Sequence, residues 1–427
     1  MPPLRLPDRA GRGRLARGWR GWPPWLTPLA AAAAVAAVLA ATLTLAGGPD
    51  RSSPHRTAAD ALLASAPRYY LVLPETGRTR RLDRLRQAAR QKAQIRATAT
   101  GRVVATITPP PDSAFTMVAT ASGVGRYVLA AQHISLTQLD GNSGYLKLVG
   151  PTRFYQLRIS SSGQVSALSP LHVPALPAGA YLYGLALSPD GRKLAVATRT
   201  SGPESGPEIQ VDTLATGAQR VWTWPGAQPI AESLGGTGSA LSWAADDSTL
   251  AFLRQIDGQC RVRLLDTTAP GSSLAASRLV LSLNETGNAI SRRFRHGRAV
   301  NNAVTSSALL TPDGSKIVVA TVTQSMHPLD SEFAFTEFSA RTGKVVAVLG
   351  RWRFTRRWPM QEQAVLWTNA DGSTLLVLAH QPGVTLNPRP PDAAASFGVE
   401  FGVLRGERYA PLPDQPRPGQ LEVLPAW

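Results

Sequence analysis

A four-residue phrase that recurs along the chain sets its fold class. It reads Ser-Pro-Asp-Gly at 188–191 and Thr-Pro-Asp-Gly at 311–314, with looser copies at 244–247 and 369–372. Each copy separates two short apolar segments. In such a turn Pro presets φ, Asp accepts from nearby backbone N–H groups, and Gly adopts a positive φ. A turn repeated in this way predicts a β-propeller, an all-β ring of four-stranded blades.

The segments between the turns group into six predicted blades. The second strand of a blade is apolar along its whole length, as at 194–197 and 317–320, which is typical of strands buried on both faces. The first blade lacks an innermost strand. The C-terminal stretch 421–424 is expected to supply it and to close the ring, which removes open sheet edges. A seven-bladed ring is the alternative, if the stretch 107–180 holds two blades. The predicted blades span 69–107, 114–169, 180–225, 237–283, 304–350 and 361–412.

An uncharged, Ala-rich segment at 26–46 has the ~20 residues that a helix needs to span a bilayer. The tail before it, 1–25, is rich in Arg and holds three tryptophans near its end, which the positive-inside rule places in the cytoplasm. We therefore expect a single-pass cell-membrane protein with one N-terminal transmembrane helix, a linker at 47–68, and an extracytoplasmic propeller at 69–427. The alternative is a signal peptide that is cleaved after Ala46.

The formal net charge is +17, and Arg contributes most of the basic residues. Because Ala, Gly and Pro are also abundant, this composition indicates a GC-rich genome, and an extracytoplasmic location argues against a nucleic-acid partner. The single cysteine, Cys260, excludes an intramolecular disulfide and a zinc site built from cysteines. We expect no cofactor.

The phrase Leu-Ser-Pro-Asp-Gly-x-x-Leu-Ala at 187–195 resembles the WD40-like repeats of TolB-type propellers. With the predicted anchor and the stretches 241–252, 337–343 and 366–375, the chain resembles a family of uncharacterised membrane-anchored propeller proteins of actinobacteria. The resemblance implies the fold and leaves the ligand open. TolB proteins carry an additional N-terminal α/β domain that we do not expect here, so their partner relationships are not carried over.

The predicted loops sort by face. In a propeller, the turns between the first and second strands and between the third and fourth strands share one face, here called the tight-turn face. The remaining connections share the opposite one, the loop face. Turns on the tight-turn face are short, except in blade 4 at 267–277. Binding residues concentrate on loops held by a rigid scaffold, and the long insertions all fall on the loop face, at 74–92, 133–151, 226–237, 284–303, 351–360 and 380–395.

Three loop-face insertions are basic, and the closed ring should bring them near one another because they adjoin blades 5, 6 and 1. Clustered Arg side chains bind phosphate or carboxylate through paired hydrogen bonds, and Trp adds a stacking surface. The candidate binding face consists of Arg78, Arg80, Arg81, Arg84, Arg86, Arg292, Arg293, Arg295, Arg298, Arg351, Trp352, Arg353, Arg356, Arg357 and Trp358.

Each basic run also has a structural interpretation. Leu82, Leu85 and Ala89 recur at helical spacing, so 78–92 can form an amphipathic helix with a solvated basic face. Trp352 alternates with arginines, as on a strand with one buried side. Scattered, solvated arginines are therefore the alternative to a functional basic face.

No catalytic motif is found: the chain lacks a Gly-x-Ser-x-Gly elbow, a His-Glu-x-x-His pair, a P-loop and a dinucleotide fingerprint. His133, His327 and His380 each follow a second strand on the loop face. Three converging histidines would give a metal site or general bases, yet their loops can equally diverge. We expect no metal and no catalytic residue.

The leading hypothesis is a non-catalytic binding or scaffold propeller, displayed on the outer side of the cytoplasmic membrane. Its partners would be the membrane itself, through 26–46, and a protein or an anionic envelope polymer. Two alternatives remain: an extracytoplasmic enzyme that uses the propeller channel, and a sensor that acts with a membrane partner.

Overall fold

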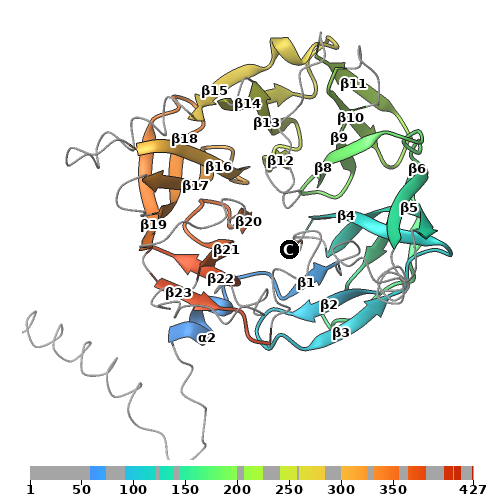
Figure 1. The fold of residues 1–427 in the computed structure, drawn as a ribbon, viewed down its shortest axis with the longest axis horizontal. Coiled ribbons are helices and arrows are strands. Elements are labelled where there is room, and N and C mark those ends of the chain that lie inside the picture. Colours follow the sequence, from blue (N-terminus) through green and yellow to red (C-terminus); the bar gives the residue numbers. More distant parts are fainter. Residues whose placement is uncertain are drawn as a thin grey trace, which may run out of the picture. The chain divides into compact units, whose positions relative to one another are not determined.

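A computed structural model shows an all-β ring of six blades (Figure 1). The segment Arg56–Trp427 forms one compact unit, and the description below concerns that unit. The structure describes residues 58–73, 92–121, 125–138, 144–199, 206–224, 241–256, 259–283, 300–325, 331–354, 364–380, 399–406, 408–414 and 426.

Each blade is an antiparallel sheet whose strands follow one another in sequence order. A short helix, α2 (Ala58–Leu63), precedes the first blade, and a 3₁₀ turn, η2 (Leu274–Ala276), lies in blade 4. The strands are β1 (Tyr69–Val72), β2 (Ala93–Ala97) and β3 (Val103–Ile107) in blade 1; β4 (Ser113–Ala121), β5 (Arg126–Gln138), β6 (Gly144–Arg158) and β7 (Ser169–Pro170) in blade 2; β8 (Tyr181–Leu187), β9 (Lys193–Arg199), β10 (Glu208–Thr213) and β11 (Gln219–Thr223) in blade 3; β12 (Leu241–Trp243), β13 (Thr249–Ile256), β14 (Gln259–Asp266) and β15 (Arg278–Ser282) in blade 4; β16 (Val300–Leu310), β17 (Lys316–Ser325), β18 (Ser331–Ser339) and β19 (Val345–Phe354) in blade 5; and β20 (Ala364–Thr368), β21 (Leu375–His380), β22 (Val399–Arg405) and β23 (Arg408–Pro411) in blade 6.

The blade count of six is confirmed, because the long stretch 107–180 forms one sheet, β4–β7, and not two. The ring closes at blade 1. The backbone N–H and C=O groups of Ala426 and Leu71 exchange two hydrogen bonds of 3.0 Å each, which adds the C-terminal segment to the free edge of β1. The stretch 421–424, which was expected to make this closure, lies outside the described residues.

The recurring turns have the structural role that their sequence predicts. In the turn before β9, the Asp190 carboxylate accepts from the Ser188 hydroxyl at 2.6 Å and from the Arg192 N–H at 2.9 Å. Gly191 completes the turn with a φ of 71°, a conformation that suits Gly. Asp246 accepts from two backbone N–H groups in the same way in blade 4. The Asp-Gly pairs therefore set strand pairing.

The second strand of each blade is buried on both faces, as predicted. The side chains of 194–197 in β9 and of 317–320 in β17 have no exposed surface. The same holds for 375–377 in β21. The burial of apolar surface, which contributes about 25 cal/mol for each Å² removed from water, is the main stabilising contribution of these strands. The core of the ring thus lies between neighbouring blades.

The insertion predicted at 133–151 is not a loop. β5 continues to Gln138 and β6 begins at Gly144, and the two remain paired from His133–Val149 to Gln138–Gly144. A register shift between Gln132 and His133 marks where the hairpin leaves the body of the blade. The alternation of Leu, Ile and Thr with polar residues in this stretch is a strand pattern, which the length of the insertion concealed.

Within the described residues, no helix combines the length and apolar character that a membrane crossing requires. The predicted transmembrane segment 26–46 lies outside those residues. Its role in anchoring stays a prediction.

Candidate functional site

The described part of the chain includes only three residues of the predicted binding face. Arg351, Trp352 and Arg353 lie on β19, the outermost strand of blade 5. The others lie outside the described residues, so the convergence of the three basic loops is not tested; these are Arg78, Arg80, Arg81, Arg84, Arg86, Arg292, Arg293, Arg295, Arg298, Arg356, Arg357 and Trp358.

The end of β19 is strand and not loop. Its register places Arg351 opposite Ala334, Trp352 opposite Phe333 and Arg353 opposite Glu332 on β18. Arg351, which is half-buried, therefore lies opposite the small Ala334.

A second group of basic residues, the Arg254 cluster, lies toward the loop-face ends of blades 3 and 4. It comprises Trp224, which follows β11, with Arg254, Arg261 and Arg263 of blade 4. The guanidinium carbon of Arg254 lies 3.2 Å from the centre of the Trp224 ring, and that of Arg263 lies 5.3 Å from it. Such stacking stabilises a cation on an aromatic face. Arg254 is only 3% exposed.

The guanidinium groups of the Arg254 cluster affect one another. Burial, and then the charges of Arg263 and Arg261, lower the pKa of Arg254 to about 10. Arg263 is fixed by blade 4, because it donates to the Ser277 hydroxyl at 2.9 Å and to the Ala275 carbonyl at 3.0 Å. Blade 4 therefore holds the Arg263 guanidinium near the Trp224 ring, on which Arg254 also stacks.

Whether the three histidines on the loop face converge is not tested by the described residues. The side chain of His133 is exposed on β5 and His380 ends β21, whereas His327 lies outside the described part. In that described part, no group of three His, Cys, Asp or Glu side chains is arranged to hold a metal ion.

On the tight-turn face, basic residues at the start of second strands bond neighbouring blades together. The Lys193 ammonium of β9 donates to the Asp247 carbonyl of blade 4 at 2.7 Å. Lys316 of β17 donates to the Asp371 carbonyl of blade 6, also at 2.7 Å. Arg126 of β5 likewise donates to the Gly191 carbonyl of blade 3. This contact recurs because the three residues hold the same position in the repeat.

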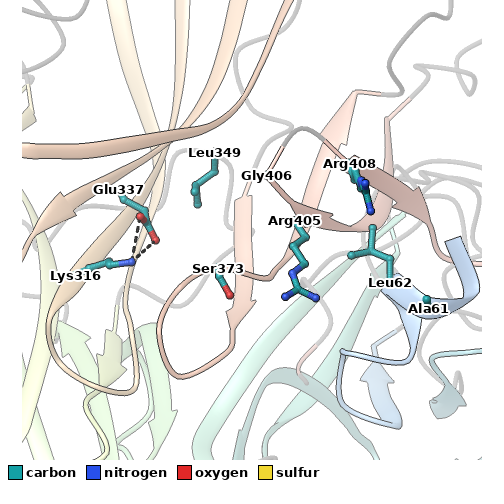
Figure 2. Close-up of a pocket in the computed structure, with 9 residues that line it drawn as sticks. All are labelled: Ala61, Leu62, Lys316, Glu337, Leu349, Ser373, Arg405, Gly406 and Arg408. Atoms are coloured by element: carbon teal, nitrogen blue, oxygen red, sulfur yellow. Dashed lines mark hydrogen bonds and ion pairs between the residues drawn. The ribbon is translucent and has the colours of Figure 1, made fainter. Parts of the chain in front are cut away.

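Beside Lys316 the structure has a cavity of about 660 Å³ on the tight-turn face, here called the blade 5–6 groove. The Lys316 ammonium lies 3.2 Å from the Glu337 carboxylate, whose side chain is 4% exposed. Figure 2 shows this ion pair on one side of the groove and two arginines of the β22–β23 turn on the other. The lining residues are Ala61, Leu62, Lys316, Glu337, Leu349, Ser373, Arg405, Gly406 and Arg408.

Sequence reasoning missed both the Arg254 cluster and the blade 5–6 groove. A signal for the inter-blade contacts was present, since Lys193 and Lys316 each follow a Pro-Asp-Gly-x tetrapeptide. The groove itself gave no local signal, because its walls come from α2, blade 5 and blade 6.

Comparison with known proteins does not assign the chain to a family. No protein-family model matches the sequence, and the curated proteins give no match. Similar solved structures include TolB from Acinetobacter baumannii, at 12% identity and a TM-score of 0.37, over 86% of this chain and 74% of that one. A protein of unknown function from Bacteroides caccae is 13% identical with a TM-score of 0.44, over 84% of this chain and 99% of that one.

The similar solved structures also include peptidases. An acylaminoacyl peptidase in complex with a chloromethyl ketone is 10% identical with a TM-score of 0.33, over 55% of this chain. The chain spans about a third of that enzyme, 32% of its length. The similar structures thus include TolB, a protein of unknown function and a peptidase, so function has to be argued from the sites of this chain.

Proposed function

We propose that the chain is a non-catalytic binding propeller, held on the outer side of the cytoplasmic membrane, whose loop face binds an anionic envelope polymer or an acidic protein surface. The observation that carries the proposal is the Arg254 cluster. Three guanidinium groups lie close enough for two of them to lower the pKa of the third.

The cluster suits anion binding for two reasons. Guanidinium groups form paired hydrogen bonds with carboxylate and phosphate, and they retain their charge at neutral pH. Arg254 itself is buried, while the half-buried Arg261 and Arg263 lie nearer to solvent, where they can contact a ligand. A ligand with repeated negative charges would meet this region and the basic insertions predicted on the same face.

The membrane part of the proposal rests on the sequence. An anchor at 26–46 with a basic tail before it orients the propeller outward. Anchoring keeps a binding module near envelope components, which raises the effective concentration of any polymer attached to the same membrane.

The test is capture from envelope fractions by the immobilised full chain in nonionic detergent, at low and at high salt. The variant Arg261→Gln/Arg353→Gln removes two charges from the loop face. The control Arg102→Gln/Arg341→Gln removes two from exposed positions on the tight-turn face. We expect salt-sensitive capture that only the first variant loses, because exposed charges are screened within about 10 Å at 0.1 M salt. Equal capture by both variants, or none by the wild type, would contradict the proposal.

A further inference from the structure

The turn between β22 and β23 places two arginines side by side at the blade 5–6 groove. Arg405 and Arg408 occupy directly opposed positions in the register of this hairpin, so their side chains project from the same face of the sheet. Both side chains are exposed. Among the described residues, none forms a hydrogen bond or an ion pair with the guanidinium group of either arginine. Glu407, in the same turn, is not among those residues.

This arrangement is not required by the fold. Like charges at directly opposed positions destabilise a strand pair. The corresponding hairpins place Asp212 opposite Gln219 in blade 3 and Phe338 opposite Val345 in blade 5. A costly pair that the repeat does not need, at the wall of a cavity, indicates a function for that cavity.

The other walls define what fits. Across the groove, the charge of Lys316 is offset by Glu337 at 3.2 Å, so the two arginines supply the excess positive charge. Leu62 of α2 and Leu349 of β19 add apolar surface. In the view of Figure 2, the Arg405 side chain lies between Ser373 and Leu62. The groove therefore combines a paired cationic wall with an apolar one.

We propose that the blade 5–6 groove binds a phosphate-bearing anion with an apolar part, through the Arg405–Arg408 pair. Two guanidinium groups match the several oxygens of a phosphate better than the two of a carboxylate. Leu62 and Leu349 contact the apolar part. A volume of about 660 Å³ lies within the range of about 300–1,000 Å³ found for small-molecule sites. This site goes beyond the proposed loop-face function and does not depend on it.

Such an anion has two sources, a soluble phosphate ester or a phospholipid headgroup. The lipid source is within reach if 26–46 anchors the chain. The residues between the anchor and α2, 47–57, span at most about 40 Å when extended, and α2 itself lines the groove.

The experiment uses the full chain in dodecyl maltoside. In the first arm, phenyl phosphate, which carries an apolar ring, is titrated by calorimetry. In the second arm, the unfolding temperature is measured in mixed micelles that contain phosphatidylglycerol or, as a control, phosphatidylcholine. Each arm compares the wild type with Arg405→Gln/Arg408→Gln and with Arg341→Gln, a control that removes one charge. Arg341 is exposed in the equivalent turn of blade 5.

We expect Arg405→Gln/Arg408→Gln to weaken binding by roughly tenfold or more, since a hydrogen bond to a charged group is worth about 1.5–3 kcal/mol and 1.4 kcal/mol is tenfold. Arg341→Gln should change it less than about twofold. Binding in the first arm supports a soluble ester, and stabilisation by phosphatidylglycerol alone supports a headgroup. Absence of binding in both arms, or equal binding by the double variant and the wild type, would overturn the proposal.

Discussion

Lys193 and Lys316 hold the same position in the repeat, yet they lie in different surroundings. Both donate to a backbone carbonyl of the next blade at 2.7 Å. Lys193 then lies 6.0 Å from the centre of the Trp243 ring, in a packed junction. Lys316 instead pairs with Glu337 at the wall of the blade 5–6 groove. The same position of the repeat thus lies in a packed junction between blades 3 and 4 and beside a polar cavity between blades 5 and 6.

A single position on the third strand accounts for the difference. Lys316 pairs in register with Ser339, and Glu337 lies two residues before it. The equivalent residue in blade 3, two before Thr213, is the buried Val211. In blade 2 it is Gln156, which accepts from Nε of Arg126 at 3.1 Å. A repeat can therefore keep its inter-blade bond while one substitution changes the polarity of the junction.

The largest expected effect separates the two lysines. Lys316→Met should lower the free energy of unfolding by about 2–4 kcal/mol, because it leaves the buried Glu337 carboxylate without its cation. Lys193→Met should cost about 1 kcal/mol, since it removes a single hydrogen bond. Urea unfolding of the full chain, followed by circular dichroism, measures both. Equal losses of stability in the two variants would show that the Glu337 carboxylate does not add to the cost of Lys316→Met.

A second substitution checks the cause of that loss. Glu337→Leu in the Lys316→Met background should recover most of the lost stability, since replacing both partners of a buried pair with apolar residues is often neutral. If the double variant does not regain stability, the loss in Lys316→Met comes from the missing hydrogen bond between Lys316 and the Asp371 carbonyl.

Two glycines of the repeated turn test how closely Glu337 packs. Gly314 and Gly372 have φ values of 70° and 77°. A Cβ atom on Gly372 would lie 2.6 Å from Glu337 Oε1, whereas one on Gly314 would lie 3.4 Å from the Ala244 methyl group. Alanine at either site costs about 1–2 kcal/mol for the left-handed conformation. Gly372→Ala should cost about 1 kcal/mol more, as measured by urea unfolding; a greater loss for Gly314→Ala would contradict this packing.

The arginine pair gives a smaller effect of opposite sign. Arg408→Gln removes a directly opposed like charge, so it should raise the free energy of unfolding by about 0.2–1 kcal/mol. Arg102→Gln, at an exposed turn position of blade 1, should leave it unchanged. A loss of stability in Arg408→Gln would mean that the pair contributes to the fold and would weaken its assignment to a ligand.

The smallest effect concerns pH. Burial raises the pKa of Glu337 above its ordinary value of 4.5, although Lys316 acts against it. A carboxyl group with a higher pKa in the folded state binds its proton more tightly there. Stability therefore falls as pH rises from about 4.5, the unfolded-state value, through the folded-state pKa.

Comparison of the wild type with Glu337→Gln at each pH isolates this contribution. The stability of the wild type relative to the variant should fall as pH rises through that window. Asp371 gives the opposite control, because its hydrogen bonds to Ser373 lower its pKa from 3.8. The stability that the Asp371 carboxylate contributes should be lost as pH falls below about 3.8. The variant Asp371→Asn should not show this part of the acid-induced loss. The same slope for both carboxylates would contradict the assignment.

The parts of the fold with local causes were predictable from sequence. The turn at 188–191 forms because Pro, Asp and Gly each act within the turn itself, and the continuous apolar run at 317–320 indicates burial on both faces. These local signals gave the number of blades and the strand order within them.

The candidate sites depended on contacts between blades, which local patterns do not encode. Glu337 and Arg405 line one cavity from two blades, and Trp224 of blade 3 meets Arg254 of blade 4. The strand content of 133–151 was missed for a different reason, since a hairpin that extends beyond its blade resembles a long insertion. The runs of arginine in the long insertions favoured the loop face as the binding surface. Arg405 and Arg408 are only two residues in a tight turn, so they give no comparable sequence signal.

The central claim is that the molecule has two basic regions with different ligands. Calorimetric titration with phenyl phosphate tests it most directly, with Arg405→Gln/Arg408→Gln and Arg261→Gln/Arg353→Gln compared with the wild type under identical salt. Each variant removes two positive charges, one pair from the groove and one from the loop face. The account predicts that only the groove variant loses binding, by roughly tenfold or more. Equal weakening in both variants would show that net charge alone attracts phosphate, and would contradict a built site between blades 5 and 6.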